Sequence, residues 1–264
     1  MISVVICAKN EADRIAGAIA AVQATGEASE LIVVDGCSSD ATAQIARDSG
    51  ALVIVSPRPS LARDRQMGAD ATHGTWVAFV DADHRVTPGD LTRLVAEAQA
   101  NDYGVLQAGL TIVPDSFWNC AESDFLALTH TPGVKDMVGV APAVFHRSVF
   151  GAVRFDGEQS IDDTDFMYRL HRDTDYRTAI SARVTVAQKH DPRFRDYLRK
   201  WRWYGRGDGQ FMRTHPERAA SMRYHLLIRY PILYPLRAVR RGLWRAVPYA
   251  IAQGLTRFTY SLTS

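Results

Sequence analysis

Short hydrophobic runs alternate with helix-spaced hydrophobic positions along the first half of the chain. Four runs of apolar, largely β-branched residues are typical of buried strands, at residues 2–7, 31–35, 51–55 and 75–80. Between them, apolar side chains recur at helical spacing, as at Ile15, Ile19 and Val22. This alternation predicts an α/β fold, with a mostly parallel sheet flanked by helices on both faces.

Polar side chains follow three of these strands. Asn10 follows the first strand, Asp35 ends the second, and Asp81 and Asp83 follow the fourth. Because the carboxyl ends of parallel strands meet at one edge of a sheet, we expect these side chains to lie close together. If the extended geometry continues through them, Asp81 and Asp83 point to the same side and suit Mg²⁺ or Mn²⁺. A solvated turn is the simpler alternative. We also expect Asn10 to cap the first helix.

The second half of the chain is less regular but contains an acidic cluster. Asp162, Asp163 and Asp165 precede Phe166 and Leu170, which have helical spacing. The cluster is therefore expected to begin a helix, where carboxylates are stabilised by the helix dipole. A purely structural role and a catalytic role both remain open.

Charge divides the chain into two predicted regions. Residues 1–192 carry 16 Lys/Arg and 26 Asp/Glu, whereas residues 193–264 carry 15 Lys/Arg and 3 Asp/Glu. We expect an acidic, cation-binding domain followed by a basic, aromatic-rich helical extension. The extension either lies in an anionic membrane interface or packs on the body with its arginines in solvent, and both interpretations remain open.

Several classes of protein are not expected. The three cysteines, Cys7, Cys37 and Cys120, form no metal-binding or disulfide spacing, which favours reduced thiols in the cytoplasm. No signal peptide is expected, and no apolar run is long enough for a membrane span. The sequence contains no dinucleotide-binding glycine fingerprint, P-loop or nucleic-acid-binding motif, so nucleic acid is not an expected partner.

Five segments, in order, resemble family 2 glycosyltransferases over roughly residues 1–192. Residues 4–11 (VVICAKNE) resemble the family's opening strand followed by Asn-Glu, and residues 33–42 (VVDGCSSDAT) its V-V-D-x-x-S-x-D-x-T segment. Residues 62–68 (ARDRQMG) resemble A-R-N-x-G, and residues 81–83 (DAD) the metal and sugar-nucleotide motif, followed by His84 where a third Asp is frequent. Residues 155–166 resemble F-D-x…E-D-x-D-L, with Asp162 in place of the usual Glu.

The resemblance implies a GT-A fold and an inverting, metal-dependent glycosyltransferase. It implies that the donor-binding residues are Asn10, Glu11, Asp35, Arg63, Arg65 and Asp81, with Asp35 on the base. A divalent cation, Mg²⁺ or Mn²⁺, is expected on Asp83, with His190 as a further ligand. Asp163 matches the family's catalytic Asp, and Asp162 is the alternative.

In the implied reaction, a sugar moves from a nucleoside diphosphate sugar to a hydroxyl or phosphate of an acceptor. Asp163 accepts the proton of the attacking group as general base. A UDP-sugar is the favoured donor, and GDP-mannose remains open. The basic extension favours a glycan or lipid-linked acceptor at the inner face of a membrane. The alternative function is a non-catalytic module of the same fold that binds a nucleotide sugar or a glycan.

Overall fold

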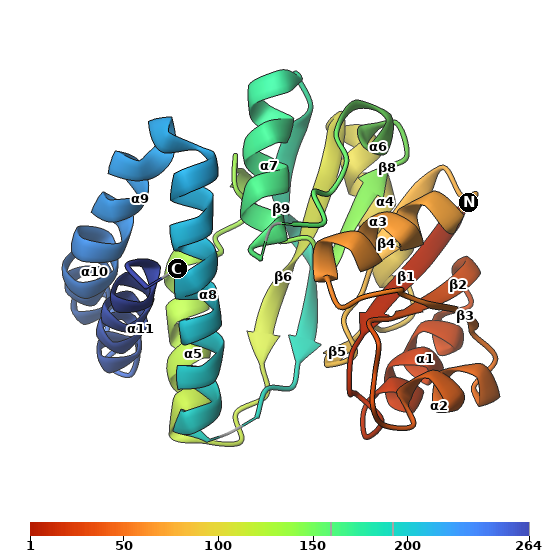
Figure 1. Cartoon of the computed structure of the whole chain (residues 1–264), viewed down its shortest axis with the longest axis horizontal. Coiled ribbons are helices and arrows are strands. Elements are labelled where there is room, and N and C mark those ends of the chain that lie inside the picture. Colours follow the sequence, from red (N-terminus) through yellow and green to blue (C-terminus); the bar gives the residue numbers. More distant parts are fainter. Residues whose placement is uncertain (159, 192, 264) are drawn as a thin grey trace. The chain divides into compact units, whose positions relative to one another are not determined.

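The computed structural model describes residues 1–158, 160–191 and 193–263, which form two compact units (Figure 1). The first unit contains residues 1–109, 132–158 and 162–188. The second contains the described residues of 110–131, 159–161 and 189–264. The second unit thus combines the basic segment after residue 192 with a segment from the middle of the sequence, which the charge pattern did not separate.

The first unit is built from one sheet and its flanking helices. Its strands are β1 (Ile2–Ala8), β2 (Ala28–Asp35), β3 (Leu52–Val55), β4 (Trp76–Phe79), β5 (His84–Arg85), β6 (Tyr103–Ile112), β7 (Gly133–Val134), β8 (Ala143–His146) and β9 (Arg177–Gln188). Its helices are α1 (Ile15–Thr25), α2 (Thr42–Asp48), α3 (Leu61–Ala71), α4 (Asp90–Ala100), α6 (Val149–Ala152) and α7 (Asp162–Asp173).

The sheet has the strand order β3-β2-β1-β4-β8-β6-β9-β5, and β7 pairs with β9. β1 pairs in parallel with β2 and β4, and β2 with β3. The expected parallel arrangement therefore holds for the first four strands. β8 pairs antiparallel with both β4 and β6, and β9 antiparallel with β5, so the complete sheet is mixed.

Both faces of the sheet are covered by helices. In β1, Val4 and Ile6 lie in one buried cluster with residues of α1 and α4. Val5 lies in a second cluster with residues of α3 and α7. Successive strand residues point to opposite faces, so a continuous apolar strand needs a helical layer on each side. Because these strands are held between two helical layers, the ends from which the polar loops leave are fixed in position.

The second unit is helical and has its own core. Its elements are α5 (Phe117–Thr129), α8 (Phe194–Thr214), a 3₁₀ turn η1 (Pro216–Arg218), α9 (Ala219–Tyr224), a π-helical segment η2 (His225–Leu233), α10 (Tyr234–Arg240) and α11 (Ala246–Ser261). Aromatic side chains dominate the core, where Trp201 is fully buried and Phe125 stacks on Tyr230 with ring centroids 5.6 Å apart. Among the described helices, none has the length and apolar character that a membrane span requires.

Candidate active site

The carboxyl ends of three parallel strands define one edge of the first unit. In the strand register, Ala8 of β1 lies beside Asp35 of β2, and Val5 lies beside Phe79 of β4. The loops that follow β1, β2 and β4 therefore leave the sheet at the same edge. This arrangement brings together the polar segments that the sequence placed after these strands.

The loop after β1 is tied to the loop after β2. Asn10 adopts a left-handed backbone conformation with φ of 56°, which asparagine tolerates better than most residues. Its backbone N–H donates to Ser38 Oγ at 2.9 Å, and its Oδ1 accepts the N–H of Ser39 at 2.8 Å. The N–H of Glu11 donates to Thr42 Oγ1 at 2.8 Å.

These contacts correct the predicted helix cap. The first helix begins at Ile15, its preceding residue is Arg14, and no side chain caps it. Asn10 lies too far upstream and its amide oxygen is occupied by Ser39. The expectation that Asn10 is an N-cap is wrong because its side chain joins two loops instead.

Two buried carboxylates lie at this edge. Asp35 is 2% exposed, and its Oδ2 accepts the N–H of Ser38 at 3.1 Å. Asp64 of α3 is 4% exposed, and burial raises the pKa of its carboxyl, with the charge of Asp35 acting in the same direction. Oδ1 of each carboxylate is buried without a hydrogen-bond partner among the described residues. Buried polar atoms normally have partners, so these oxygens are candidates for ligand contacts.

Asp64 was not predicted as a site residue. The sequence feature that could have identified Asp64 is its position beside Arg63 in residues 62–68. A position on a helix does not by itself show which side of the helix faces the edge of the sheet. In the structure, the side chain of Asp64 faces Gly36, the residue that follows Asp35. A Cβ on Gly36 would lie 2.7 Å from Asp64 Oδ2, so the absence of a side chain there lets the two acids approach.

Asp81, Asp83 and His84 lie in a tight turn after β4. The strand ends at Phe79, so the extended geometry that would have placed Asp81 and Asp83 on one side does not continue through them. The N–H of His84 donates to the carbonyl of Asp81 at 3.0 Å, which closes the turn. The turn still gathers the carboxylates: ligand atoms of Asp81, Asp83 and His84 all lie within 4.8 Å of one another. Such oxygen ligands suit a hard divalent cation.

The ring of His84 has a defined role in this turn. It is 1% exposed, and its Nδ1 accepts the backbone N–H of Asp81 at 3.0 Å. A neutral imidazole whose Nδ1 accepts a hydrogen bond carries its proton on Nε2. Nε2 lies 3.8 Å from Asp83 Oδ1, which is beyond hydrogen-bond distance. His84 therefore fixes the backbone at Asp81, and the carboxylates of Asp81 and Asp83 supply the oxygen ligands that a hard cation prefers.

Arg65 connects this turn to the acidic start of α7. Its guanidinium is buried, with Nη1 2.5 Å from Asp162 Oδ2 and Nη2 3.9 Å from Asp81 Oδ1. Burial lowers the pKa of Arg65, but Asp162 and Asp81 outweigh this and raise it above its ordinary value. Burial raises the pKa of Asp162 to about 6, against the opposing charge of Arg65.

The three acids of α7 have different partners. Asp162 is bound by Arg65, and Asp165 is buried and accepts two hydrogen bonds from Arg169. Asp163 is half-buried, and its Oδ1 accepts the N–H of the neighbouring Thr164 at 2.7 Å. Within the described residues, Asp163 is the one member of the cluster without an arginine partner.

The two predicted arginine ligands also differ. Arg65 is engaged by carboxylates, as described. Arg63 follows the N-cap Ser60 on α3, and its Nη2 lies 3.5 Å from the exposed Glu158. Its Nη1 is buried and has no hydrogen-bond partner in the described part of the chain. Arg63 is therefore the better placed of the two to contact an anionic ligand.

His190 belongs to the second unit. Its Nδ1 lies 2.5 Å from Oε2 of the buried Glu122, and its Nε2 lies 3.5 Å from Lys200 Nζ. Burial alone would raise the pKa of Glu122, but Lys200, His190 and a hydrogen bond from Tyr197 lower it to about 2. The ring thus donates from Nδ1 to the carboxylate of Glu122, and its Nε2 faces the ammonium group of Lys200. Its role as a metal ligand stays a prediction.

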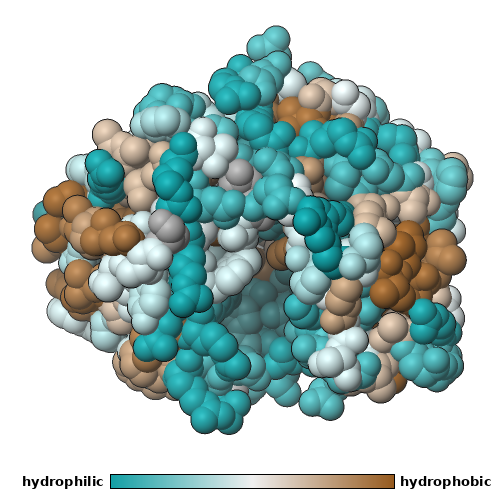
Figure 2. All heavy atoms as spheres, in the orientation of Figure 1, coloured by the Kyte–Doolittle hydropathy of each residue, from teal (hydrophilic) through white to brown (hydrophobic). Residues whose placement is uncertain are grey.

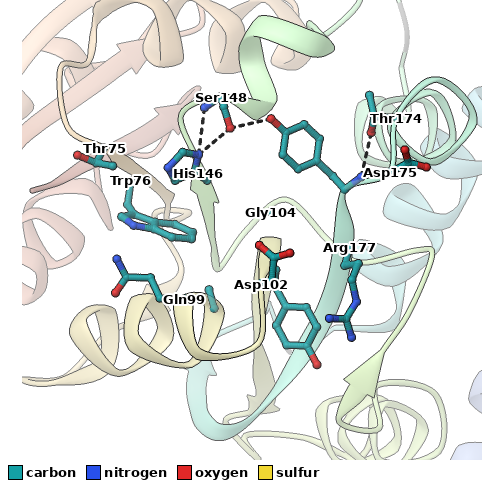
Figure 3. Close-up of a pocket in the computed structure, with 13 residues that line it drawn as sticks. Thr75, Trp76, Gln99, Asp102, Gly104, His146, Ser148, Thr174, Asp175 and Arg177 are labelled. Atoms are coloured by element: carbon teal, nitrogen blue, oxygen red, sulfur yellow. Dashed lines mark hydrogen bonds between the residues drawn. The ribbon is translucent and has the colours of Figure 1, made fainter.

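A pocket of about 600 Å³ lies at the opposite edge of the same sheet (Figure 3). Trp76 at the start of β4 and His146 at the end of β8 contribute to its wall, together with Arg177 at the start of β9. The ring of His146 packs edge-on against Trp76, with centroids 5.2 Å apart. None of the acids described above lines this pocket, so it is separate from the candidate active site.

Comparison with known protein families identifies the family of this chain. Residues 3–155 match the family described as "Glycosyl transferase family 2". The chain belongs to this family. The matching range includes Asp35, Asp64 and the turn with Asp81 and Asp83, and it ends before the acidic start of α7.

Two curated relatives illustrate the sequence similarity. The chain is 34% identical over 146 residues to succinoglycan biosynthesis protein ExoU of Rhizobium meliloti, which covers 52% of this chain and 41% of that protein. It is 38% identical over 96 residues to the uncharacterized glycosyltransferase Mb0553 of Mycobacterium bovis, which covers 36% of this chain and 43% of that protein. The chain spans less than half the length of these relatives.

Solved structures share the fold over almost the whole chain. The mannosyltransferase PcManGT from Pyrobaculum calidifontis, in complex with GDP-Man and Mn²⁺, has a TM-score of 0.68 at 16% identity and covers 97% of this chain and 86% of that one. S. aureus TarS 1-349 in complex with UDP-GlcNAc has a TM-score of 0.58 at 16% identity, covering 99% of this chain and 90% of that one. These similarities confirm the expected GT-A type of fold with a helical C-terminal extension.

Proposed function

We propose that this family 2 protein transfers a sugar from a nucleoside diphosphate sugar to a hydroxyl or phosphate of an acceptor, with inversion at the anomeric carbon. The observation that supports this most directly is the chain of contacts from Asp81 through Arg65 to Asp162. It joins the candidate metal turn to the helix that carries Asp163. A donor held at the turn and a proton acceptor on α7 therefore belong to one connected site.

The donor base is assigned to the edge formed by Asp35 and Asp64. Oδ1 of Asp35 is a buried acceptor that lacks a partner, which suits an N–H group of a nucleobase. Asn10 and Glu11 shape the same edge through their bonds to Ser38 and Thr42. The free Nη1 of Arg63 is a donor for a phosphate or sugar oxygen. We take a UDP-sugar as the first donor to test, with GDP-mannose second.

The residues present fit a divalent cation such as Mg²⁺ or Mn²⁺. Asp81 and Asp83 would hold it, because both supply carboxylate oxygens and both are partly exposed, with side chains 37% and 20% exposed. When bound, the cation neutralises charge that develops on the leaving diphosphate. His84 fixes the turn that carries both carboxylates, because its Nδ1 accepts the backbone N–H of Asp81.

Asp163 is the proposed general base. An acceptor hydroxyl is a weak nucleophile until its proton is removed as it attacks. Asp162 and Asp165 are held by arginines, whereas Asp163 is half-buried and bound only at Oδ1 by its neighbour. Oδ2 of Asp163 is thus available to receive the proton. Attack opposite the diphosphate inverts the anomeric centre.

The test separates chemistry from donor binding. Asp163→Asn should lower the rate of sugar transfer roughly 10²- to 10⁴-fold, the usual contribution of a general base, while UDP affinity stays near wild type. Asp83→Asn should instead weaken UDP binding in the presence of Mn²⁺. Initial rates and calorimetric titrations with UDP and GDP measure both effects.

Asp173→Asn provides a matched control, because Asp173 is an exposed acid at the other end of the same helix. It should leave rate and affinity unchanged. Full turnover by Asp163→Asn would refute the assigned base. Nucleotide binding without any sugar transfer in wild type, across UDP- and GDP-sugars, would favour the non-catalytic alternative.

A further inference from the structure

A row of large apolar side chains is exposed along one side of the second unit. Tyr224, Ile228, Ile232, Leu236 and Val239 are each 37–52% exposed. They occur at intervals of four, four, four and three residues through the end of α9, η2 and α10, so they lie on one side of this helical segment. We call this row the 224–239 stripe. Figure 2 shows hydrophobic surface in the part of the view where Figure 1 draws α9 and α10.

The same segment already buries another apolar row. Leu226, Tyr230, Tyr234 and Ala238 have the same four-residue spacing and lie in the aromatic core of the second unit. The core therefore accounts for one side of the helix and leaves the 224–239 stripe uncovered. A contiguous exposed apolar surface of this kind usually marks an interaction site.

The charged residues of the segment that carries the stripe are all positive, although the exposed Glu217 immediately precedes it. Residues 218–264 contain eight arginines, no lysine, and no aspartate or glutamate. Arg223, Arg237, Arg240 and Arg241 are exposed, and none of them forms an ion pair within the described part of the chain. Tyr224 at the beginning of the stripe and the 63% exposed Trp244 beyond its end are aromatic residues of the kind enriched at membrane interfaces.

We infer that the 224–239 stripe docks on an anionic lipid bilayer, with its aliphatic side chains in the interface and its arginines at the lipid headgroups. Apolar side chains flanked by arginines and aromatic residues are the combination that holds a helix in the plane of a membrane surface. Neither the arginines nor the apolar side chains are sufficient for firm binding by themselves. Exposed charges are screened by salt, and a few half-exposed side chains bury little apolar area. This inference does not depend on the proposed sugar transfer.

Charge and shape favour the bilayer over two other occupants. A second copy of the chain on this face would oppose two arginine-rich surfaces with no acidic residue in the segment to neutralise them. Nucleic acid would use the arginines, but single strands bind through stacked aromatic side chains, and the centre of the stripe is aliphatic. A bilayer satisfies both the aliphatic and the cationic groups.

Vesicle sedimentation with the 264-residue chain tests the inference. Wild type should bind vesicles of phosphatidylcholine mixed with phosphatidylglycerol more strongly than vesicles of phosphatidylcholine alone, and binding should weaken with salt. Ile232→Ser with Leu236→Ser should reduce the partition coefficient about tenfold, through lost apolar burial. Arg237→Gln with Arg240→Gln should reduce it about thirtyfold at low salt, since each arginine near the surface contributes about 1 kcal/mol.

Matched controls come from the first unit. Leu52 and Val55 of β3 are 61% and 51% exposed, so Leu52→Ser with Val55→Ser removes similar apolar surface. Arg47 and Arg183 are exposed arginines, so their change to Gln removes the same charge. Both control pairs should bind vesicles like wild type.

Equal binding of the wild type to neutral and anionic vesicles, or an equal loss of binding in the test and control pairs, would overturn the inference. So would an Ile232→Ser/Leu236→Ser protein that binds normally, or one whose only change is loss of a dimer in sedimentation velocity.

Discussion

At the scale of single residues, the candidate site depends on how each carboxylate is compensated. Arg65 neutralises Asp162 and faces Asp81, whereas Arg169 neutralises Asp165. A buried carboxylate without such a partner would be costly, and removing one partner of a buried pair typically costs about 3–5 kcal/mol. The arginines therefore stabilise Asp162 and Asp165, and we propose Asp163, which has no arginine partner among the described residues, as the proton acceptor.

The raised pKa of Asp162 predicts a specific dependence of stability on pH. Its pKa is about 6 in the folded protein and 3.8 in the reference state, so folding favours the protonated form. The resulting contribution is complete below about pH 4 and is lost as pH rises through 6. Relative to Asp162→Asn, wild type should lose on the order of 3 kcal/mol of unfolding free energy between pH 4 and pH 7.

Urea unfolding of both proteins across this pH range measures the difference. The comparison with Asn is needed because other groups titrate as well, among them Glu122, whose pKa near 2 gives the opposite slope at lower pH. Wild type and variant curves that stay parallel would show that Asp162 titrates normally. A wild type that gains stability with pH would show that Arg65 outweighs burial.

The residue types of the site were visible in the sequence, but their partners were not. Asp81, Asp83 and Asp163 were predicted from position after a strand and from motif spacing. That Arg65 faces Asp81 and Asp162 requires α3 and α7 to approach the same edge, although the two residues of the ion pair lie 97 positions apart. The approach of Asp64 to Asp35 is hidden for the same reason, because the two acids lie on different elements. Long-range pairing of this kind is set by tertiary packing, which no local pattern encodes.

At the scale of elements, glycine controls how closely two helices of the second unit approach. Gly205 of α8 faces α11, where a Cβ would lie 2.5 Å from the carbonyl oxygen of Arg257 and 2.8 Å from Tyr260 Cβ. The close approach allows Arg257 to form two hydrogen bonds with the buried Asp208, at 2.7 and 2.8 Å. Glycine is unfavourable inside a helix, so packing must compensate for it here.

Gly205→Ala should therefore destabilise the protein by about 1–3 kcal/mol, because the added methyl group meets backbone that cannot move freely. Gly151→Ala is the matched control: Gly151 is also helical, and nothing lies within 4 Å of an added Cβ. It should be neutral or stabilise by up to about 1 kcal/mol through helix propensity. Thermal unfolding of both variants measures the contrast, and equal effects would show that α8 and α11 can separate without cost.

Prediction of the elements succeeded where the local pattern is strong. The first three predicted strands agree with the structure. β4 is shorter than its apolar run because His84 closes a turn right after it. The charge-rich segment after residue 192 was predicted to be helical, yet its sequence does not show which side packs inward. Both the buried row at Leu226 and Tyr230 and the exposed row at Ile228 and Ile232 consist of large apolar or aromatic residues, so residue type alone does not tell them apart.

At the scale of the whole molecule, each unit has its own core, but the units are not consecutive segments. The core of the second unit contains Phe125 and Leu128 of α5, which pack with aromatic residues from beyond residue 192. Glu122 of the same helix is hydrogen-bonded by Tyr197 and Tyr249. The boundary that the charge pattern suggested, between residues 192 and 193, therefore divides a hydrophobic core and a buried polar network.

A protein truncated after residue 192 should not fold normally. Phe125 and Leu128 would lose their aromatic partners, and Glu122 would lose the tyrosines and Lys200 that keep it charged in a buried place. We expect this fragment to aggregate or to bind a hydrophobic dye, and to lack a cooperative thermal transition. A chain that ends at Ser261 is the control, since it retains all of α11 and removes the exposed Leu262. It should melt like the 264-residue chain. If residues 1–192 instead give a monomer that unfolds cooperatively, α5 does not need the basic segment, and the second unit is an appendage to a self-sufficient transferase domain.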